Sequence, residues 1–123
     1  MEKIIVKDDD TVLRRIPNKS SHINKDGTLS SANFIGPDTS VNIERLTTIE
    51  ETLAGYESFG LVRLSTGSIR ALGADVVHDP LDNNYSHAII PGKRSAHVAR
   101  KFATTATIVI MPELDRGNAL HAV

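Results

Sequence analysis

Residues 92–106 contain a group of basic side chains with the spacing of one helix face. At about 100° per residue, a helix over residues 93–105 places Val98 and Phe102 together on an apolar face. The opposite face has no carboxylate and consists of Lys93, Arg94, His97, Arg100 and Lys101. Such a surface can bind phosphate groups, nucleic acid or an acidic protein surface. The alternative is a solvated helix face that has no partner.

The start of this helix gives a second reason to expect an anion. Pro91 and Gly92 predict a turn just before the first helical N–H groups, which have no partner within the helix and attract negative charge. Lys93 and Arg94 at that end each destabilise the helix by about 0.3–1 kcal/mol, unless an anion or an acidic partner residue offsets their charges. A nucleotide-binding P-loop is excluded, because His87 stands where that motif needs glycine and Arg94 where it needs Ser or Thr.

A second helix start is predicted at residues 65–68, Ser-Thr-Gly-Ser, directly after a strand. The hydroxyls of Ser65 and Ser68 suit a small anion, and Arg63 and Arg70 flank them. The alternative is an ordinary N-cap, in which a hydroxyl accepts hydrogen bonds from the first helical amides.

Four residues are weak candidates for catalysis. His78 and His87 flank a predicted hairpin loop, so we expect their imidazoles to be cross-strand neighbours with Asp79 or Asp82 nearby. That arrangement would provide a general acid–base pair or a site for a metal with two histidines and one carboxylate. The alternative is a plain strand end in which Asp79 caps a turn. Arg14 and Arg15 point to opposite faces of one strand, so one of them is expected to turn inward toward a carboxylate or a ligand.

The elements that must position these residues are short. Lys3–Val6 and Thr11–Ile16 predict a hairpin, followed by a loop-rich segment over residues 17–42. A capping box predicts a helix that begins at Thr47 or Thr48 and ends at Ala54. The remaining expected elements are strands at 29–34, 40–43, 59–64, 75–78, 86–90 and 107–111, a helix at 65–72 and the basic helix. Residues 113–123 are expected to form a disordered tail.

This order of elements predicts an α+β fold with a single domain over residues 1–123. We expect a small mixed or antiparallel sheet with two to three short helices packed on it. The predicted core consists of Ile5, Leu13, Phe34, Leu53, Leu61, Leu64, Ile69, Leu72, Val76, Ile89, Val98, Phe102 and Ile108.

Composition excludes several classes of function. The chain has no cysteine, which excludes disulfides, thiolate metal sites and cysteine nucleophiles. A net charge of −1 does not favour a dedicated nucleic-acid-binding protein, although nucleic acid stays possible as a partner. No apolar run reaches membrane-spanning length, so we expect a cytoplasmic protein without a membrane partner. We predict neither a cofactor nor a metal site.

The sequence favours a small binding or accessory protein over an enzyme, because it contains no recognisable catalytic motif. In this hypothesis the basic helix face contacts an acidic protein surface, a phosphorylated ligand or nucleic acid. A first alternative is a small enzyme that acts on a phosphate-bearing or nucleotide substrate. In it His78 and His87 would be the acid–base groups, and Arg14, Arg15 or Lys93 would clamp the anion. A second alternative is a protein that self-associates through an edge strand such as Lys3–Val6.

Overall fold

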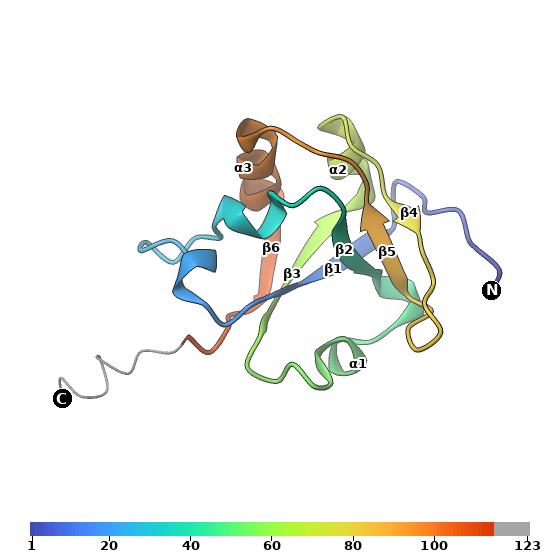
Figure 1. The fold of residues 1–123 in the computed structure, drawn as a ribbon, viewed down its shortest axis with the longest axis horizontal. Coiled ribbons are helices and arrows are strands. Elements are labelled where there is room, and N and C mark those ends of the chain that lie inside the picture. The colour runs from blue at the N-terminus through green and yellow to red at the C-terminus, as the bar shows by residue number, and fades with distance from the viewer. Residues whose placement is uncertain (115–123) are drawn as a thin grey trace.

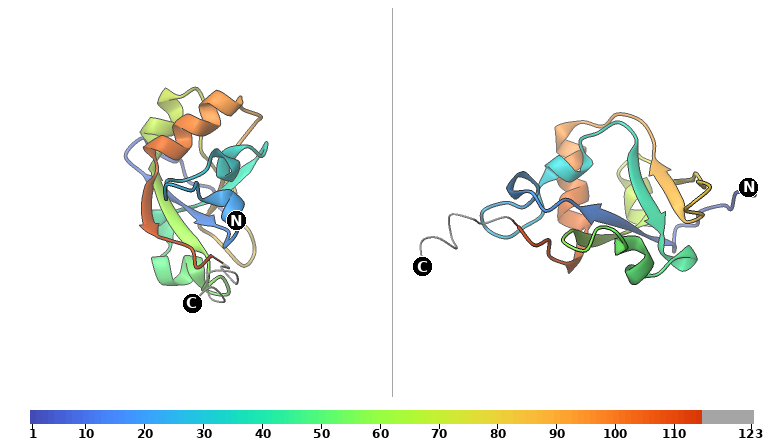
Figure 2. Two further views of the ribbon diagram at one scale, coloured as in Figure 1. Left: turned by 90° about the vertical axis from the view of Figure 1, so that its left-hand side faces the viewer. Right: turned by 60° about the horizontal axis from the view of Figure 1, so that its bottom comes forward.

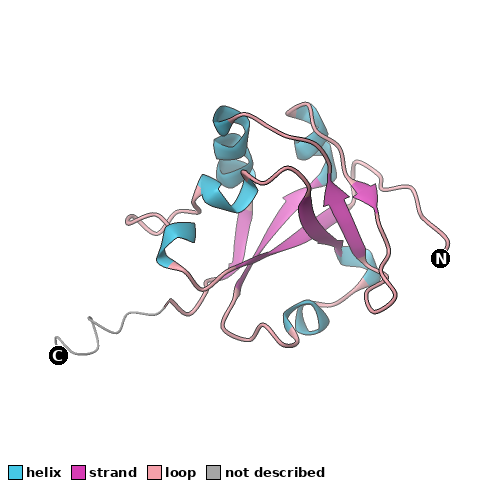
Figure 3. Ribbon diagram, viewed as in Figure 1, coloured by secondary structure: helices cyan, strands magenta, loops and turns pink. Residues whose placement is uncertain are grey.

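A computed structural model describes residues 1–114. Within these residues the chain forms a six-stranded sheet in the order β4-β5-β2-β1-β3-β6, in which every strand pair is antiparallel. Helices lie above and below the sheet in the view of Figure 1, and Figure 3 separates helices from strands by colour. The predicted α+β class is therefore confirmed, with an antiparallel sheet.

The elements are as short as the sequence predicts. The strands are β1 (Thr11–Ile16), β2 (Thr39–Ile43), β3 (Gly60–Ser65), β4 (Val77–His78), β5 (His87–Ile90) and β6 (Thr107–Ile110). The α-helices are α1 (Ile49–Leu53), α2 (Thr66–Ala71) and α3 (Ala96–Thr105). Three 3₁₀ turns occur at Ser20–His22, Ser31–Phe34 and Glu44–Leu46.

Alternation along the central strand β1 gives the sheet two different faces. Val12, Arg14 and Ile16 point to one face, and Leu13 and Arg15 point to the other. The first is the core face, where α2, α3 and the 3₁₀ turn at Ser31–Phe34 contribute apolar side chains to one buried cluster. The second, which we call the groove face, is covered in part by α1 and by the loop that joins β4 to β5 (Figure 2).

Most of the predicted core is buried. Leu13, Phe34, Leu61, Leu64, Ile69, Val76 and Phe102 are buried as expected, whereas Leu53, Leu72, Ile89 and Val98 are half-buried. Two predictions are wrong, because Ile5 is 82% exposed and Ile108 is 36% exposed. Ile5 lies in an N-terminal segment outside the sheet, and Ile108 lies on the edge strand β6.

The predicted hairpin between Lys3–Val6 and Thr11–Ile16 does not form, because β2 and β3 occupy both sides of β1. The segment 3–6 is not a strand, and side chains bind its backbone instead. Arg70 donates to the carbonyl oxygen of Val6 at 2.7 Å, and the N–H of Ile4 donates to His78 at 2.9 Å. This segment therefore provides no edge strand for self-association.

The predicted strand at residues 29–34 is also wrong. Ser30 caps the 3₁₀ turn Ser31–Phe34, with its Oγ accepting from the N–H of Ala32 at 3.1 Å. The turn directs Asn33 and Phe34 into the core. The predicted tail at 113–123 falls almost wholly outside the described residues, which end at Leu114.

Candidate functional site

The basic face of α3 has the predicted two-sided character. Ala99 and Phe102 are buried against the core, and Phe102 meets Phe34 edge to face at 5.9 Å between ring centroids. The opposite side of α3 is exposed and carries His97, Arg100 and Lys101, and Lys93 lies exposed just before the helix. The ion pairs within residues 1–114 involve none of these four basic residues. We call these four residues the basic face.

The helix begins three residues later than predicted, at Ala96. Ser95 is its N-cap, and the Ser95 Oγ accepts from the N–H of Val98 at 3.2 Å. Lys93 and Arg94 therefore precede the helix. Gly92 has a φ of 84°, and its N–H donates to the carboxylate of Asp38 at 2.9 Å. The Asp38 carboxylate of the same chain thus binds the Gly92 N–H, which was predicted to bind an external anion.

Arg94 is not part of the basic face, and its side chain bridges two segments of the chain. Its guanidinium donates at 2.7 to 3.3 Å to the carbonyl oxygens of Phe34, Gly36, Ile90 and Gly92 and to the Thr39 hydroxyl. Burial lowers the pKa of Arg94, and the Asp38 carboxylate acts in the opposite direction. The Arg94 side chain therefore holds residues 34–39 against residues 90–92.

The start of α2 is an ordinary N-cap. Ser65 Oγ accepts from the N–H of Ser68 at 2.9 Å and lies 2.8 Å from the Ser68 hydroxyl. The two hydroxyls predicted to hold an anion thus bond to each other and to the helix backbone.

His78 and His87 are not neighbours, because they lie on opposite faces of the β4–β5 hairpin. His78 pairs in register with Ala88, one residue after His87, so the two imidazoles point in opposite directions. His78 is 1% exposed on the core face. The predicted histidine pair is therefore wrong, and residues 1–114 contain no cluster of three His, Asp or Glu side chains that could hold a metal.

Arg14 and Arg15 do lie on opposite faces. Arg14 turns toward the core face and donates to the carbonyl oxygens of Asn33 at 3.2 Å and Ser40 at 2.8 Å. Burial lowers the pKa of Arg14 to about 10, and the charges of Arg15 and Arg94 act in the same direction. The Arg14 guanidinium is thus bound to backbone oxygens of the protein itself.

Arg15 and His87 both line a polar groove of about 730 Å³ on the groove face. Strands β1, β2 and β5 form its floor, α1 and the following turn form one wall, and the β4–β5 loop forms the other. Its polar lining consists of Arg15, Ser40, Asn42, Thr47, Glu51, Thr52, Tyr56, Asn83, Asn84, Tyr85, Ser86 and His87.

Arg15 is held at one side of the groove by two contacts. Its Nη1 donates to the carbonyl oxygen of Thr52 at 3.0 Å, and its guanidinium carbon lies 4.0 Å above the ring centroid of Tyr56. The ring and the carbonyl fix the orientation of the guanidinium plane.

His87 is held at the other side. Its Nδ1 lies 2.8 Å from the carbonyl oxygen of Asp79 and 3.3 Å from the Asp79 Oδ2, while its Nε2 lies 3.2 Å from the Ser40 Oγ. The His87 side chain is only 14% exposed, whereas Ser40 is exposed. Ser40 is not among the residues predicted from the sequence, although polar residues at positions 40 and 42 of an otherwise apolar strand indicate one polar face.

A buried network fixes the wall formed by the β4–β5 loop. Asn84 Nδ2 donates to Asn42 Oδ1 at 2.7 Å. Ser86 Oγ lies 2.6 Å from Asn84 Oδ1 and 3.1 Å from Asn42 Oδ1. The loop is therefore bonded to the sheet floor, and the groove has a defined shape without a ligand.

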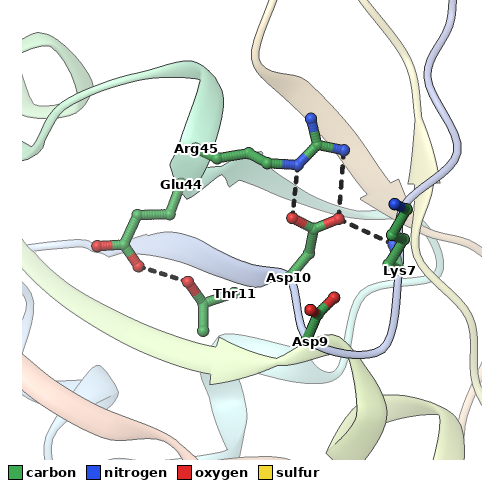
Figure 4. Close-up of a pocket in the computed structure, with 6 residues that line it drawn as sticks. All are labelled: Lys7, Asp9, Asp10, Thr11, Glu44 and Arg45. Atoms are coloured by element: carbon green, nitrogen blue, oxygen red, sulfur yellow. Dashed lines mark hydrogen bonds and ion pairs between the residues drawn. The ribbon is translucent and has the colours of Figure 1, made fainter.

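A second hollow lies beside the turn before β1, where Lys7, Asp9, Asp10, Thr11, Glu44 and Arg45 line it (Figure 4). Two of its three carboxylates already have partners. Asp10 binds Arg45 at 2.6 Å, and Glu44 accepts from Thr11 at 2.7 Å and from Arg63 at 2.7 Å. Burial raises the pKa of Asp10, but hydrogen bonds from Arg45 and the Lys7 amide outweigh it and lower the pKa overall. These internal pairs explain the polarity of the hollow.

Comparisons with protein-family models, with curated proteins and with solved structures found no match to this chain. None of the helices in residues 1–114 combines the length and apolarity needed to cross a bilayer. The groove and the basic face are therefore the two candidate sites.

Proposed function

We propose that this protein binds a phosphate-bearing small ligand, of the nucleotide class or smaller, in the polar groove. The observation that carries the proposal is that Arg15 and His87 line one groove. The sequence marks Arg15 as an anion clamp and His87 as an acid–base group. His78 and Arg14 have no part in it, because their polar atoms bind the protein backbone.

Arg15 supplies the positive charge. A guanidinium has five N–H donors in a planar fork that matches phosphate oxygens. Within residues 1–114 the one hydrogen bond of the Arg15 side chain is to the carbonyl oxygen of Thr52. Tyr56 holds the plane of this fork in place before a ligand arrives. Such preorganisation lowers the entropy cost of binding.

The chemistry of the remaining lining suits a polar ligand. Most of the lining side chains are hydroxyls, amides and tyrosines, which can hydrogen-bond sugar or phosphate oxygens. One carboxylate, Glu51, lies exposed at the rim and opposes an anion. The groove volume of about 730 Å³ lies in the range of small-molecule sites.

A titration of isotope-labelled protein with inorganic phosphate and with AMP tests this proposal. Saturable NMR shifts are expected at Arg15, Ser40 and His87, and Arg15→Gln should weaken binding about tenfold or more, because a charged hydrogen bond is lost. Arg100→Gln, the same change on the basic face, should leave the affinity unchanged. The proposal is wrong if neither ligand shifts groove resonances, or if Arg100→Gln weakens binding as much as Arg15→Gln.

A second candidate function uses the basic face of α3 to contact an acidic protein surface, a phosphorylated ligand or nucleic acid. It is supported by three exposed cations and one exposed histidine without ion-pair partners in the part of the chain that the structure describes. Lys93→Glu with Arg100→Glu should abolish binding to a polyglutamate peptide, whereas Arg15→Gln should not. For a short DNA duplex, each phosphate contact adds about 0.9 to the slope of log K against log salt, so a flat response excludes nucleic acid.

A further inference from the structure

We infer that Ser40 is a nucleophile that His87 activates and Asp79 orients, so that the groove cleaves phosphate monoesters rather than only binding them. The inference rests on the proposed phosphate-binding groove. It goes further because it assigns a reaction to three residues in contact, only one of which the sequence analysis treated as a catalytic candidate.

The hydrogen bonds of His87 determine which ring nitrogen carries the proton. The carbonyl oxygen of Asp79, 2.8 Å from Nδ1, can only accept a hydrogen bond. Nδ1 must therefore carry the proton, and the Asp79 Oδ2 lies 3.3 Å from this nitrogen. In the neutral ring the lone pair then lies on Nε2, which faces the Ser40 hydroxyl at 3.2 Å. Ser40 consequently donates to His87, as a hydroxyl must when the imidazole is to remove its proton.

The sheet places these groups in a row across three adjacent strands. Ser40 belongs to β2, His87 to β5, and Asp79 directly follows β4. Asn42 pairs with His87 and Ser40 with Ile89, so Ser40 and His87 are diagonal neighbours on one face. The N–H of Asp79 also donates to the carbonyl oxygen of His87 at 2.9 Å. Regular strands, rather than a mobile loop, thus hold the nucleophile and the base.

Arg15 completes the arrangement from β1. Strand β1 pairs with β2 through Val12 with Ile43 and Leu13 with Asn42, and Arg15 and Ser40 both line the groove. The proposed reaction requires that a phosphate bound to Arg15 also reaches the Ser40 hydroxyl. The negative charge of the phosphate, which would repel an attacking oxygen, is offset by the guanidinium.

The reaction has two balanced steps. In the first, Ser40 Oγ forms a bond to phosphorus, its proton moves to His87 Nε2, and the P–O bond to the alcohol breaks as that proton passes to the leaving oxygen. In the second, His87 takes a proton from water, the water oxygen bonds to phosphorus, and the bond to Ser40 Oγ breaks as Oγ regains a proton. The net change converts ester and water into alcohol and inorganic phosphate.

The chain offers a matched control. Ser21 Oγ lies 3.1 Å from His22 Nδ1, but these are adjacent residues and the contact is exposed. No hydrogen bond in residues 1–114 orients the other nitrogen of that ring. A hydroxyl beside an imidazole is thus present twice, and only the Ser40 pair lies in the groove with an orienting group.

Hydrolysis of p-nitrophenyl phosphate, followed by acid quenching and peptide mass spectrometry, tests the inference. Wild-type protein should release p-nitrophenol and carry a phosphoryl group on Ser40. Ser40→Ala and His87→Gln should each reduce the rate by about 100-fold or more, whereas Ser21→Ala should not change it. A fluorophosphonate should label Ser40 in wild type and fail to label His87→Gln. Circular dichroism of each variant checks that it is folded.

The outcomes separate this inference from the proposed function. If phosphate binds in an Arg15-dependent manner but Ser40 is neither phosphorylated nor labelled, the nucleophile is wrong and the binding site stands. If Ser40 is labelled in a His87-dependent manner while phosphate does not bind, the nucleophile stands and the phosphate proposal fails. Equal rates in wild type and Ser40→Ala also overturn the inference.

Discussion

His78 accepts a hydrogen bond at Nδ1 from the backbone N–H of Ile4, 2.9 Å away and 74 residues earlier in the chain. Its Nε2 lies 2.6 Å from the carbonyl oxygen of Tyr85, which can only accept, so that nitrogen carries the ring proton. The Tyr85 hydroxyl in turn donates to the carbonyl oxygen of Glu2 at 2.7 Å. The imidazole thus joins the N-terminal segment to the β4–β5 loop, and its role is structural.

His78→Ala should therefore destabilise the protein. The change leaves a backbone N–H and a carbonyl without partners and opens a cavity, which together should lower the free energy of unfolding by about 2–4 kcal/mol. His97→Ala, on the exposed side of α3, should change it by less than about 0.5 kcal/mol. Urea denaturation of both variants measures the difference, and equal midpoints would show that the Ile4 bond contributes little.

Gly60→Ala should also destabilise the fold. A Cβ at this position would lie 2.6 Å from Pro112 Cδ and 2.7 Å from the carbonyl oxygen of Ile110, so β3 and the end of β6 would have to separate. Such overpacking costs about 1–3 kcal/mol. Gly36→Ala meets no atom within 4 Å and is the control, with stability unchanged or raised by up to about 1 kcal/mol. Thermal unfolding that ranks the two variants the other way would contradict this account of the β3–β6 contact.

Phe102→Ala should lower the free energy of unfolding by about 3–5 kcal/mol, because the ring is fully buried. The Phe102 ring would lose its edge-to-face contact with Phe34. It would also lose its contact with the Arg94 guanidinium, whose carbon lies 5.4 Å from the ring centroid. That is a large share of a total stability of about 5–15 kcal/mol. Chemical denaturation is the measurement, and a loss below about 1 kcal/mol would contradict the packing of α3.

Glu44 should make stability depend on pH in the acid range. Hydrogen bonds from Arg63 lower the pKa of Glu44 below its usual 4.5, with burial opposing and Thr11 assisting. Because the folded-state pKa is the lower one, the contribution is present above about pH 4.5 and is lost as the pH falls through the folded value. Both side chains are partly exposed, so solvent screening limits it to about 1 kcal/mol. Glu44→Gln should be less stable than wild type at pH 7, and the gap should narrow as the pH falls below 4.5. A constant gap would contradict the ion pair.

Glu51→Gln should strengthen phosphate binding in the groove. Glu51 is the carboxylate at the rim, and removing a charge that repels the ligand is worth about 0.2–1 kcal/mol at an exposed site, or roughly 1.4- to 5-fold in affinity. Glu50→Gln, on the same helix but not part of the lining, is the control. Calorimetric titration with inorganic phosphate measures both, and equal affinities would place the ligand away from this rim.

The sequence by itself determined the features that depend on a few consecutive residues. Thr48 caps α1 through the N–H of Glu51, Ser65 caps α2 through the N–H of Ser68, and Phe102 is buried. These features follow from local hydrogen bonding and from helical periodicity, so the α+β class could be predicted together with most elements. The prediction placed the start of α3 too early, because Ser95 rather than Gly92 stands at the boundary and caps the helix.

The groove was decided by the tertiary structure. Pairing β5 with β2 brings Ser40 to His87 across 47 residues, and a register different by one would have turned His87 into the core and His78 out of it. Alternation along a strand shows which residues share a face but not which face is buried. That choice depends on where α2 and α3 pack, which involves contacts far apart in the chain.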